Sequence, residues 1–311
     1  MKDSLGDRMK GYYEDRYRLS LPRRSNIVIR IDGKAFHTYT RGLNKPYDEA
    51  LMEDMNQTTR YLCENIQGAK LGYVQSDEIS IVLTDYDTID TSGWFDYNLQ
   101  KMCSIAASLA TAHFNFLRMQ RYFCGNQDNV AVENDKTIGE HFRPGTNLED
   151  VRDDIASFVN YMPIKHKVAL FDARIFVIPE QEEVVNYFVW RQQDATKNGI
   201  SMAAQSLFSH KALHGMKGNE MQDKMMTEKN VNWNDFPVRF KRGGVVVKRE
   251  QNWYKLKDKP NVHPRSCSDA QLPNIQKDPN NIIFQRSAWT AIDPPIFTQD
   301  RNFILNELPA K

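Results

Sequence analysis

Few features of this 311-residue sequence suit a secreted or membrane-embedded protein. No apolar run approaches the ~20 residues that a membrane helix needs, and the N-terminus is polar, so we expect a cytoplasmic protein with no membrane partner. The chain has only four cysteines, which are far apart and form no Cys-x-x-Cys pair. This spacing argues against a zinc module or a disulfide framework and favours reduced thiols.

The sequence also lacks a net charge that could attract a partner. Its 41 Lys and Arg residues nearly balance its 40 Asp and Glu residues, so any polyanion must be met by local patches. Such basic groups occur at residues 23–24, 165–167, 239–242 and 248–249. No internal repeat or low-complexity tract is present.

The apolar patterning predicts alternating strands and helices in the first part of the chain. A β-branched run at 26–32 is followed by a helix at about 45–68, which starts at Pro46 and Asp48. Two apolar runs within 72–83 fold back on each other, and a helix at 94–122 precedes a strand at 173–178. This β-α-β-β-α-β order predicts an α/β (α+β) protein with a ferredoxin-like sheet, the form taken by polymerase palms, and with helices on one face.

Composition divides the chain into two expected parts. Residues 1–245 form the predicted palm-type catalytic domain, with an insertion at about 125–167 that includes a short helix at 148–161. Residues 246–311 form a loop-rich C-terminal extension, in which 255–281 is expected to be a long loop. The last residues, from 283 onward, are expected to dock as a tail.

Helical spacing makes two further predictions. In the helix at 94–122, one face carries Ile105, Leu109, Ala112, Phe116 and Met119. Residues 181–213 read as a helix that is broken or loosened near Asn198 and Gly199, with Trp190 as a core anchor.

Two acidic segments at strand ends predict a metal site. Asp32 closes the first strand and Asp77 lies between the paired runs, so the two can meet only if their strands are neighbours, as the predicted order allows. Hard oxygen ligands with room for substrate phosphates suit Mg²⁺, so Asp32, Asp77 and the Gly33 carbonyl are expected to hold two Mg²⁺ ions. Glu78 is expected to lie behind these ligands or to bind an ion occasionally. The alternative is that Asp32 and Gly33 form a turn and that Asp77 and Glu78 form a solvated hairpin tip.

The segment after the first strand predicts contacts with a nucleotide. Backbone N–H groups of residues 33–37 are expected to face a triphosphate, with Phe36 or His37 against the base, although Phe36 could equally be core and His37 a turn cap. Ser76 could bond a phosphate oxygen or simply close the hairpin. The nucleotide-binding candidates are therefore Gly33, Lys34, Ala35, Phe36, His37 and Ser76, together with the cations Lys45, Lys101 and Arg174.

Five motifs in order carry a family resemblance. They are DGKAFH at 32–37, KPYD at 45–48, QSDE at 75–78, FDAR at 171–174 and WRQQD at 190–194, and they resemble the tRNA-His guanylyltransferase superfamily over most of residues 25–245. The resemblance implies a 3′-5′ polymerase with a palm-like fold that uses ATP, GTP and other NTPs on tRNA 5′ ends. It also implies a homotetramer.

One segment departs from the eukaryotic pattern. Where those enzymes carry His-Ile-Asn-Asn-Leu-Tyr-Asn, this chain reads TKNGISM at 196–202, and only Asn198 stays in place. The segment resembles the bacterial and phage-type guanylyltransferase-like branch, which implies template-directed repair of 5′-truncated tRNA. In the implied mechanism, ATP activates a 5′-monophosphate end, or a 5′-triphosphate end is used directly. An NTP 3′-hydroxyl then attacks the 5′ phosphorus, and AMP or pyrophosphate leaves.

The resemblance also indicates which residues could meet the RNA 5′ end. These are Arg191, Lys197 and Asn198, with Arg30 on the same side of its strand as Asp32. His210 and His214 have a metal-ligand spacing without an acidic partner between them, which favours a surface or phosphate contact over zinc. Three alternative functions stay open: tRNA-His-specific guanylylation, a palm-type nucleotide cyclase or signalling nucleotide synthase, and an inactive RNA-binding protein.

Overall fold

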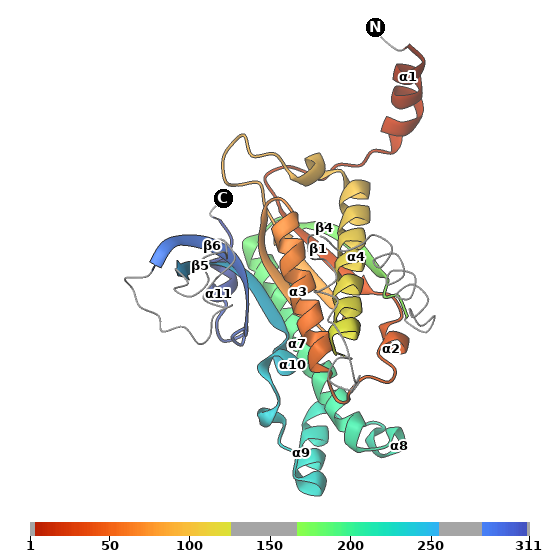
Figure 1. Ribbon diagram of the computed structural model, residues 1–311, viewed down its shortest axis with the longest axis vertical. Coiled ribbons are helices and arrows are strands. Elements are labelled where there is room, and N and C mark those ends of the chain that lie inside the picture. The colour runs from red at the N-terminus through yellow and green to blue at the C-terminus, as the bar shows by residue number, and fades with distance from the viewer. Residues whose placement is uncertain (1–3, 126–166, 255–281, 310–311) are drawn as a thin grey trace, which may run out of the picture.

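The computed structural model describes residues 4–125, 167–254 and 282–309 (Figure 1). Its centre is a six-stranded antiparallel sheet in the order β4-β1-β3-β2-β5-β6. The first four strands of this order follow the ferredoxin-like arrangement, so the predicted fold class is confirmed. The strands are β1 (Asn26–Gly33), β2 (Ala69–Gln75), β3 (Glu78–Leu83), β4 (Phe171–Ile178), β5 (Gly244–Tyr254) and β6 (Ile282–Ile292).

Two long helices cover one face of the sheet, as expected. They are α3 (Glu49–Asn65) and α4 (Leu99–Gly125), which lie side by side in Figure 1. Because side chains alternate along a strand, Ile27, Ile29 and Ile31 all point to this face, where they are fully buried. The odd-numbered residues of β1 therefore build the core under α3 and α4.

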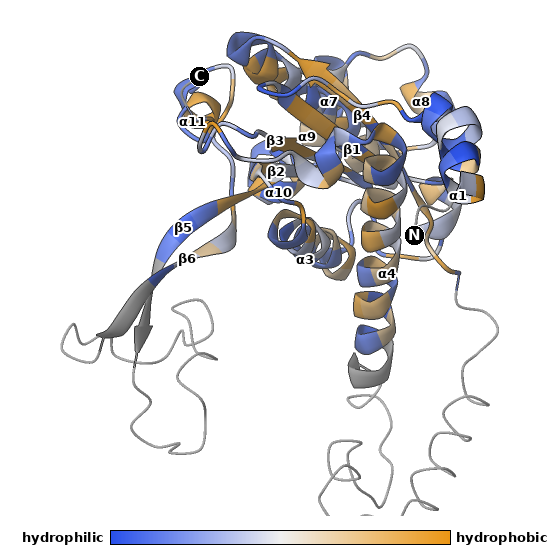
Figure 2. Cartoon of the chain, turned by 90° about the horizontal axis from the view of Figure 1, so that it is seen from above, coloured by the Kyte–Doolittle hydropathy of each residue, from blue (hydrophilic) through white to orange (hydrophobic). Residues whose placement is uncertain are grey.

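A third long helix, α7 (Gln181–Leu207), covers the opposite face, so that the sheet lies between two helical layers (Figure 2). Val28 and Val82 pack there against Val184 and Phe188. The expected break near Asn198 and Gly199 is absent, because α7 runs through both residues. A Cβ on Gly199 would lie 2.9 Å from the Trp233 ring and 3.0 Å from the Phe240 carbonyl oxygen, so this glycine serves close helix packing rather than a bend.

The helix α4 is apolar on two sides. Its core contacts come from Met102, Ala106, Ala110 and Phe114, which are fully buried. Most of the face predicted from the sequence points outward instead: Phe116 is 54% exposed and Ile105 and Met119 are each 38% exposed, whereas Leu109 packs against the core. Helical spacing alone could not decide which of the two faces the sheet would bury.

The C-terminal part adds strands to the sheet. β5 pairs with β2, and β6 pairs with β5 from Val245 opposite Ile292 to Tyr254 opposite Ile282. Residues from 283 onward are therefore not only a docked tail, because the first ten of them belong to β6. The predicted boundary at 245 falls one residue inside β5. The predicted helix at 148–161 and loop at 255–281 lie outside the described residues.

Shorter elements complete the described chain. They are α1 (Ser4–Met9), η1 (Lys10–Glu14), η2 (Asp15–Tyr17), α2 (Phe36–Tyr39), η3 (Trp94–Tyr97), α8 (His210–Leu213), α9 (Gly218–Lys229), η5 (Trp233–Asp235), α10 (Val238–Arg242) and α11 (Asn302–Leu305). Among the helices in these ranges, none has the length and apolar character that crossing a bilayer would require.

Candidate active site

The two predicted metal-binding aspartates come from neighbouring parts of the sheet. In the pairing of β1 with β3, Asp32 lies opposite Glu78. The Gly33 N–H donates a hydrogen bond of 3.1 Å to the Asp77 carbonyl oxygen, which ties the end of β1 to the β2–β3 turn. The strand order thus brings together two residues that lie far apart in the sequence.

The electrostatics of Asp77 suit a cation ligand. Burial raises the pKa of its carboxyl, and the charges of Asp32 and Glu78 raise it further, against the lowering effect of hydrogen bonds. One of these bonds comes from the Ser76 hydroxyl, which donates to Asp77 Oδ1 at 3.0 Å. A partly buried carboxylate beside like charges gains from a hard cation, so the donor set fits Mg²⁺.

The described residues contain no group of three or more His, Cys, Asp and Glu side chains arranged to hold a metal. The remaining ligands of Mg²⁺ would therefore be backbone carbonyls, waters and substrate phosphates, which is the usual pattern for this ion. One exposed cation already lies near: Arg174 Nη2 is 3.5 Å from Asp32 Oδ2, and the Arg174 side chain is 57% exposed.

The backbone on both sides of the carboxylates is held in an uncommon conformation. Ala35, before α2, has φ +52°, and Ser76, in the β2–β3 turn, has φ +48°. Left-handed backbone at a residue other than glycine costs on the order of 1 kcal/mol, and such strain clusters at functional sites. Within residues 33–37, the N–H groups of Gly33 and Lys34 donate hydrogen bonds to the Asp77 and Leu170 carbonyl oxygens. The first N–H groups of α2 have no acceptor within that helix.

The two aromatic candidates of this segment have different positions. Phe36 is buried, and its ring lies 4.8 Å from Tyr39, 5.5 Å from Phe171 and 5.7 Å from Phe114 between centroids. The core interpretation therefore holds for Phe36, although it also forms part of a cavity wall. His37 is exposed on the same wall, with Nε2 3.0 Å from the Thr38 hydroxyl.

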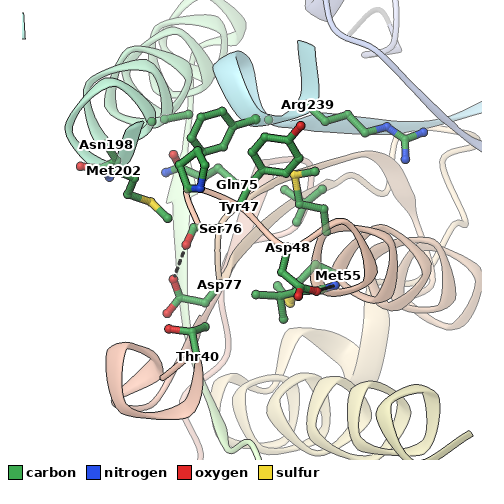
Figure 3. Close-up of a pocket in the computed structure, with 18 of the residues that line it drawn as sticks. Thr40, Tyr47, Asp48, Met55, Gln75, Ser76, Asp77, Asn198, Met202 and Arg239 are labelled. Atoms are coloured by element: carbon green, nitrogen blue, oxygen red, sulfur yellow. Dashed lines mark hydrogen bonds between the residues drawn. The ribbon is translucent and has the colours of Figure 1, made fainter. Parts of the chain in front are cut away.

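A cavity of about 370 Å³ opens beside the Asp77 turn (Figure 3). Figure 3 shows Ser76 and Asp77 on one side, Asn198 and Met202 from α7 on another, and Tyr47 and Asp48 toward α3. Asp48 also caps α3, since its carboxylate accepts the Leu51 N–H at 2.9 Å. Thr40, Met55 and Asn56 also line the cavity, although the sequence had not marked them as part of a site. Tyr47, Met202 and Arg239 belong to segments that the sequence had marked, but no contact with a nucleotide was predicted for them.

Lys45 and Lys101, both predicted to bind phosphate, lie in different places. Lys45 lines the cavity, but Lys101 is in the first turn of α4. Further along α4, Asn115 forms hydrogen bonds with Ala169, which lies near the end of β1. The helix between Lys101 and Asn115 is about 20 Å long, so Lys101 lies about that far from the end of β1. Lys101 is therefore too far from the site to bind a phosphate of the nucleotide, and that prediction was wrong.

The arginines that α4 brings near the cavity are Arg118 and Arg121. They bond the buried carboxylate of Asp54 at 3.0 and 2.5 Å. Arg121 also lines a second, more open depression next to the cavity, together with Lys45. Sequence spacing had not singled out either arginine.

Glu78 and Arg191 bind each other rather than facing outward. Arg191 Nε and Nη2 lie 2.7 and 3.0 Å from the two oxygens of Glu78, and Nη2 also donates to Asp194 at 2.7 Å. Arg30 Nη2 is 2.6 Å from Glu78 Oε2. Glu78 and Arg191 are buried, so this network joins β1, β3 and α7 below the Asp77 turn. The donors of Arg191 are committed to it, which corrects the expected RNA contact.

Other predicted residues of α7 are accessible. Asn198 is exposed at the cavity, with its amide 3.4 Å from Asp194, and Lys197 is exposed beside it. Trp190 is 51% exposed, so the expectation of a core anchor was wrong. The rings of His210 and His214 are 6.3 Å apart.

Several of the predicted basic groups are used within the fold. Arg23 bonds Asp85 and the Thr91 carbonyl, beyond the end of β3 that is remote from Asp77. Arg249 pairs with Glu307, and Arg239 pairs with Glu53 near the cavity. Sequence clusters of basic residues thus did not by themselves identify an RNA surface.

Comparisons with known proteins identify relatives of this chain. A family model described as tRNAHis guanylyltransferase matches residues 6–179. The chain is 25% identical to the tRNA(His) guanylyltransferase of Saccharomyces cerevisiae, over 72% of this chain and 82% of that protein. It is 26% identical to the uncharacterized protein R259 of Acanthamoeba polyphaga mimivirus, over 80% and 78%.

Solved structures extend the likeness to nearly the whole chain. A bacterial tRNA(His) guanylyltransferase-like protein in complex with ATP is 40% identical and covers 98% of both chains, with a TM-score of 0.68. One in complex with GTP is 37% identical over 98% of this chain and 99% of that one, with a TM-score of 0.65.

Proposed function

We propose, since the chain belongs to the tRNAHis guanylyltransferase family, that it adds nucleotides to the 5′ ends of truncated tRNAs in the 3′-5′ direction. It is a nucleotidyltransferase with tRNA guanylyltransferase-like activity. The similarity to proteins in complex with ATP and with GTP supports these two nucleotides as its substrates. The finer proposal is template-directed repair.

The observation that carries the proposal is a pair of carboxylates beside a cavity of nucleotide size. Asp32 and Asp77 would hold two Mg²⁺ ions, and the volume of about 370 Å³ lies within the range of ligand pockets. When bound there, the ions would stabilise the charge on the attacking and leaving oxygens. The protein's own part is to hold the base in the cavity and to keep the 3′-hydroxyl aimed at the RNA 5′ phosphorus.

Side chains at the cavity supply contacts to the triphosphate. Ser76 precedes the metal-binding Asp77, Lys45 lies on the wall, and Arg174 extends past Asp32 from β4. Lys45 and Arg174 are exposed, so each can turn its charge to a phosphate group.

Lys45→Ala and Arg174→Ala are each expected to raise the KM for NTP by about 10- to 100-fold, which is the loss of one charge-assisted hydrogen bond. Steady-state extension of a 5′-truncated tRNA over a range of NTP concentrations measures this. Lys101→Ala is the matched control, because Lys101 lies at the far end of α4, and its KM should equal that of the wild type. Equal KM values in all three variants would mean that Lys45 and Arg174 are only solvated.

Base choice is the second test of the proposal. Three methionines from α3 and α7, Met52, Met55 and Met202, lie on the cavity wall, and such flexible side chains accept different bases. Selection by pairing with the opposite strand then decides which nucleotide enters.

A tRNA that lacks its first 5′ nucleotide is therefore expected to gain the complement of the unpaired base opposite. Changing that base should change the incorporated nucleotide, as sequencing of the products with all four NTPs will show. Addition of G whatever stands opposite, on tRNA-His alone, would replace repair by tRNA-His-specific guanylylation.

The other function class predicted from the sequence is separated by the same assay. A cyclase or signalling nucleotide synthase would consume labelled NTP without tRNA.

We also propose that the chain forms a homotetramer. The exposed apolar face of α4, which carries Ile105, Phe116 and Met119, offers a surface for contact between subunits.

A further inference from the structure

An exposed tryptophan lies outside the cavity, on the α7 side of the sheet. Trp190 is 51% exposed, yet its indole is held in place by neighbours. The Arg191 guanidinium lies 4.2 Å from the ring centroid, the Arg30 guanidinium lies 5.8 Å from it, and the Tyr187 ring packs edge-on at 5.9 Å. A large aromatic surface that is fixed but accessible is suited to binding a flat ligand.

Trp190 also lies close to the carboxylates. Arg30, which contacts its ring, precedes Asp32 by two residues on β1, so the two side chains point to the same face about 7 Å apart. Across the sheet, Arg30 pairs with Arg174, whose guanidinium is 3.5 Å from Asp32. The indole, the exposed Arg174 and the carboxylate of Asp32 therefore lie around one region of the sheet.

This region is separate from the cavity that would take the incoming nucleotide. The cavity is lined by Asn198 and Met202 of α7 and by residues of the α3 side, and Trp190 is not among them. Asn198 follows Trp190 by about eight residues, or roughly 12 Å of helix. Asp77 thus lies at the cavity, and Asp32 lies toward the aromatic surface.

We propose that Trp190 is a stacking platform for the 5′-terminal base of the tRNA. The inference rests on the proposed function, in which the cavity is taken by the NTP and the RNA end must approach from elsewhere. Stacking holds every base, because every base has a flat face, so it suits an enzyme that extends different 5′ ends. Arg30 and Arg191 are paired with Glu78, so they hold the indole rather than attract the RNA, whereas the exposed Arg174 leaves a cation beside it.

The test is a double-mutant cycle between the protein and the RNA. Wild type and Trp190→Ala are each assayed with a truncated tRNA and with the same tRNA carrying an abasic 5′-terminal nucleotide. Removing either the indole or the base should raise the KM for tRNA on the order of tenfold, and removing both should cost no more than removing one. The KM for NTP should not change, and Trp190→Phe should keep most of the affinity.

Other results would overturn the stacking. If the increases in the KM for tRNA caused by removing the indole and by removing the base multiply in the combined variant, Trp190 does not contact the terminal base. An increase in the KM for NTP alone would lead to the same conclusion. Filter binding of the two RNAs to the wild type and to Trp190→Ala, without NTP, separates this inference from the proposed function. If the abasic RNA binds more weakly to the wild type but not to Trp190→Ala, and neither RNA is extended, the platform stands and the proposed reaction fails. If both RNAs bind and are extended equally, the reaction stands and the platform fails.

Discussion

Asp77→Asn is expected to lower the rate of nucleotide addition by more than about 10³-fold, which corresponds to about 4 kcal/mol of transition-state stabilisation. The amide keeps the size of the side chain but loses the negative charge that the proposed Mg²⁺ site needs. Single-turnover extension of a truncated tRNA at saturating Mg²⁺ measures the effect. Asp32→Asn should behave alike, because the two carboxylates face the same ions.

The folding stability of the Asp77→Asn variant should move in the opposite direction. Burial and neighbouring charges raise the pKa of Asp77 in the folded protein, so its ionisation costs folding free energy as the pH rises through that pKa. The amide does not ionise, and the variant should therefore be at least as stable as the wild type at neutral pH, with the difference vanishing in acid. Urea denaturation at several pH values, without Mg²⁺, checks this sign.

Asp87→Asn is the matched control for both measurements. Asp87 is an exposed carboxylate whose partner is Lys70, and it should change neither activity nor, by more than about 0.5 kcal/mol, stability. Near-wild-type extension by Asp77→Asn or Asp32→Asn would end the proposal of a two-metal site.

Arg191→Met is expected to destabilise the fold by about 3 to 5 kcal/mol, because it leaves the buried charge of Glu78 with one partner fewer. Burial alone would lower the pKa of the guanidinium, but the charges of Glu78 and Asp194 raise it above its usual value. The arginine is therefore charged in the folded protein. The midpoint of urea denaturation, followed by circular dichroism, measures the loss.

A second substitution distinguishes lost pairing from lost packing. Adding Glu78→Gln to Arg191→Met removes the unpaired charge and should restore part of the stability. Arg60→Ala breaks an exposed ion pair with Glu64 and should cost less than about 0.5 kcal/mol. If Arg191→Met were as mild as Arg60→Ala, the network around Glu78 would not hold α7 to the sheet.

The part of the fold that could be predicted depends on local pattern. The β-branched run of β1 and the two runs around Ser76 and Asp77 each specify a strand, and their order restricts the sheet to few topologies. Adjacency of Asp32 and Asp77 follows from that topology. The lining of the cavity behind Ser76 was predicted only in part: Lys45 lines it, Lys101 does not, and Asn198, predicted for the RNA 5′ end, lines it as well.

The errors come from interactions that no local pattern specifies. Arg191 could have met RNA phosphate or a carboxylate, and only the packing of α7 on β3 decides for Glu78. Trp190 was assigned to the core by residue type, but its helical position faces away from the buried Val184 and Phe188. Gly199 suggested a break, whereas it allows Trp233 to approach α7.

The unbroken course of α7 has a consequence for repeated addition. If one rigid helix carries both Trp190 and Asn198, the distance between the RNA end on Trp190 and the incoming base at Asn198 stays constant. After each addition the new 5′ nucleotide lies on the cavity side of the carboxylates. The RNA must then withdraw by one base before the next cycle, and this translocation has to come from movement of the RNA rather than from a hinge within α7.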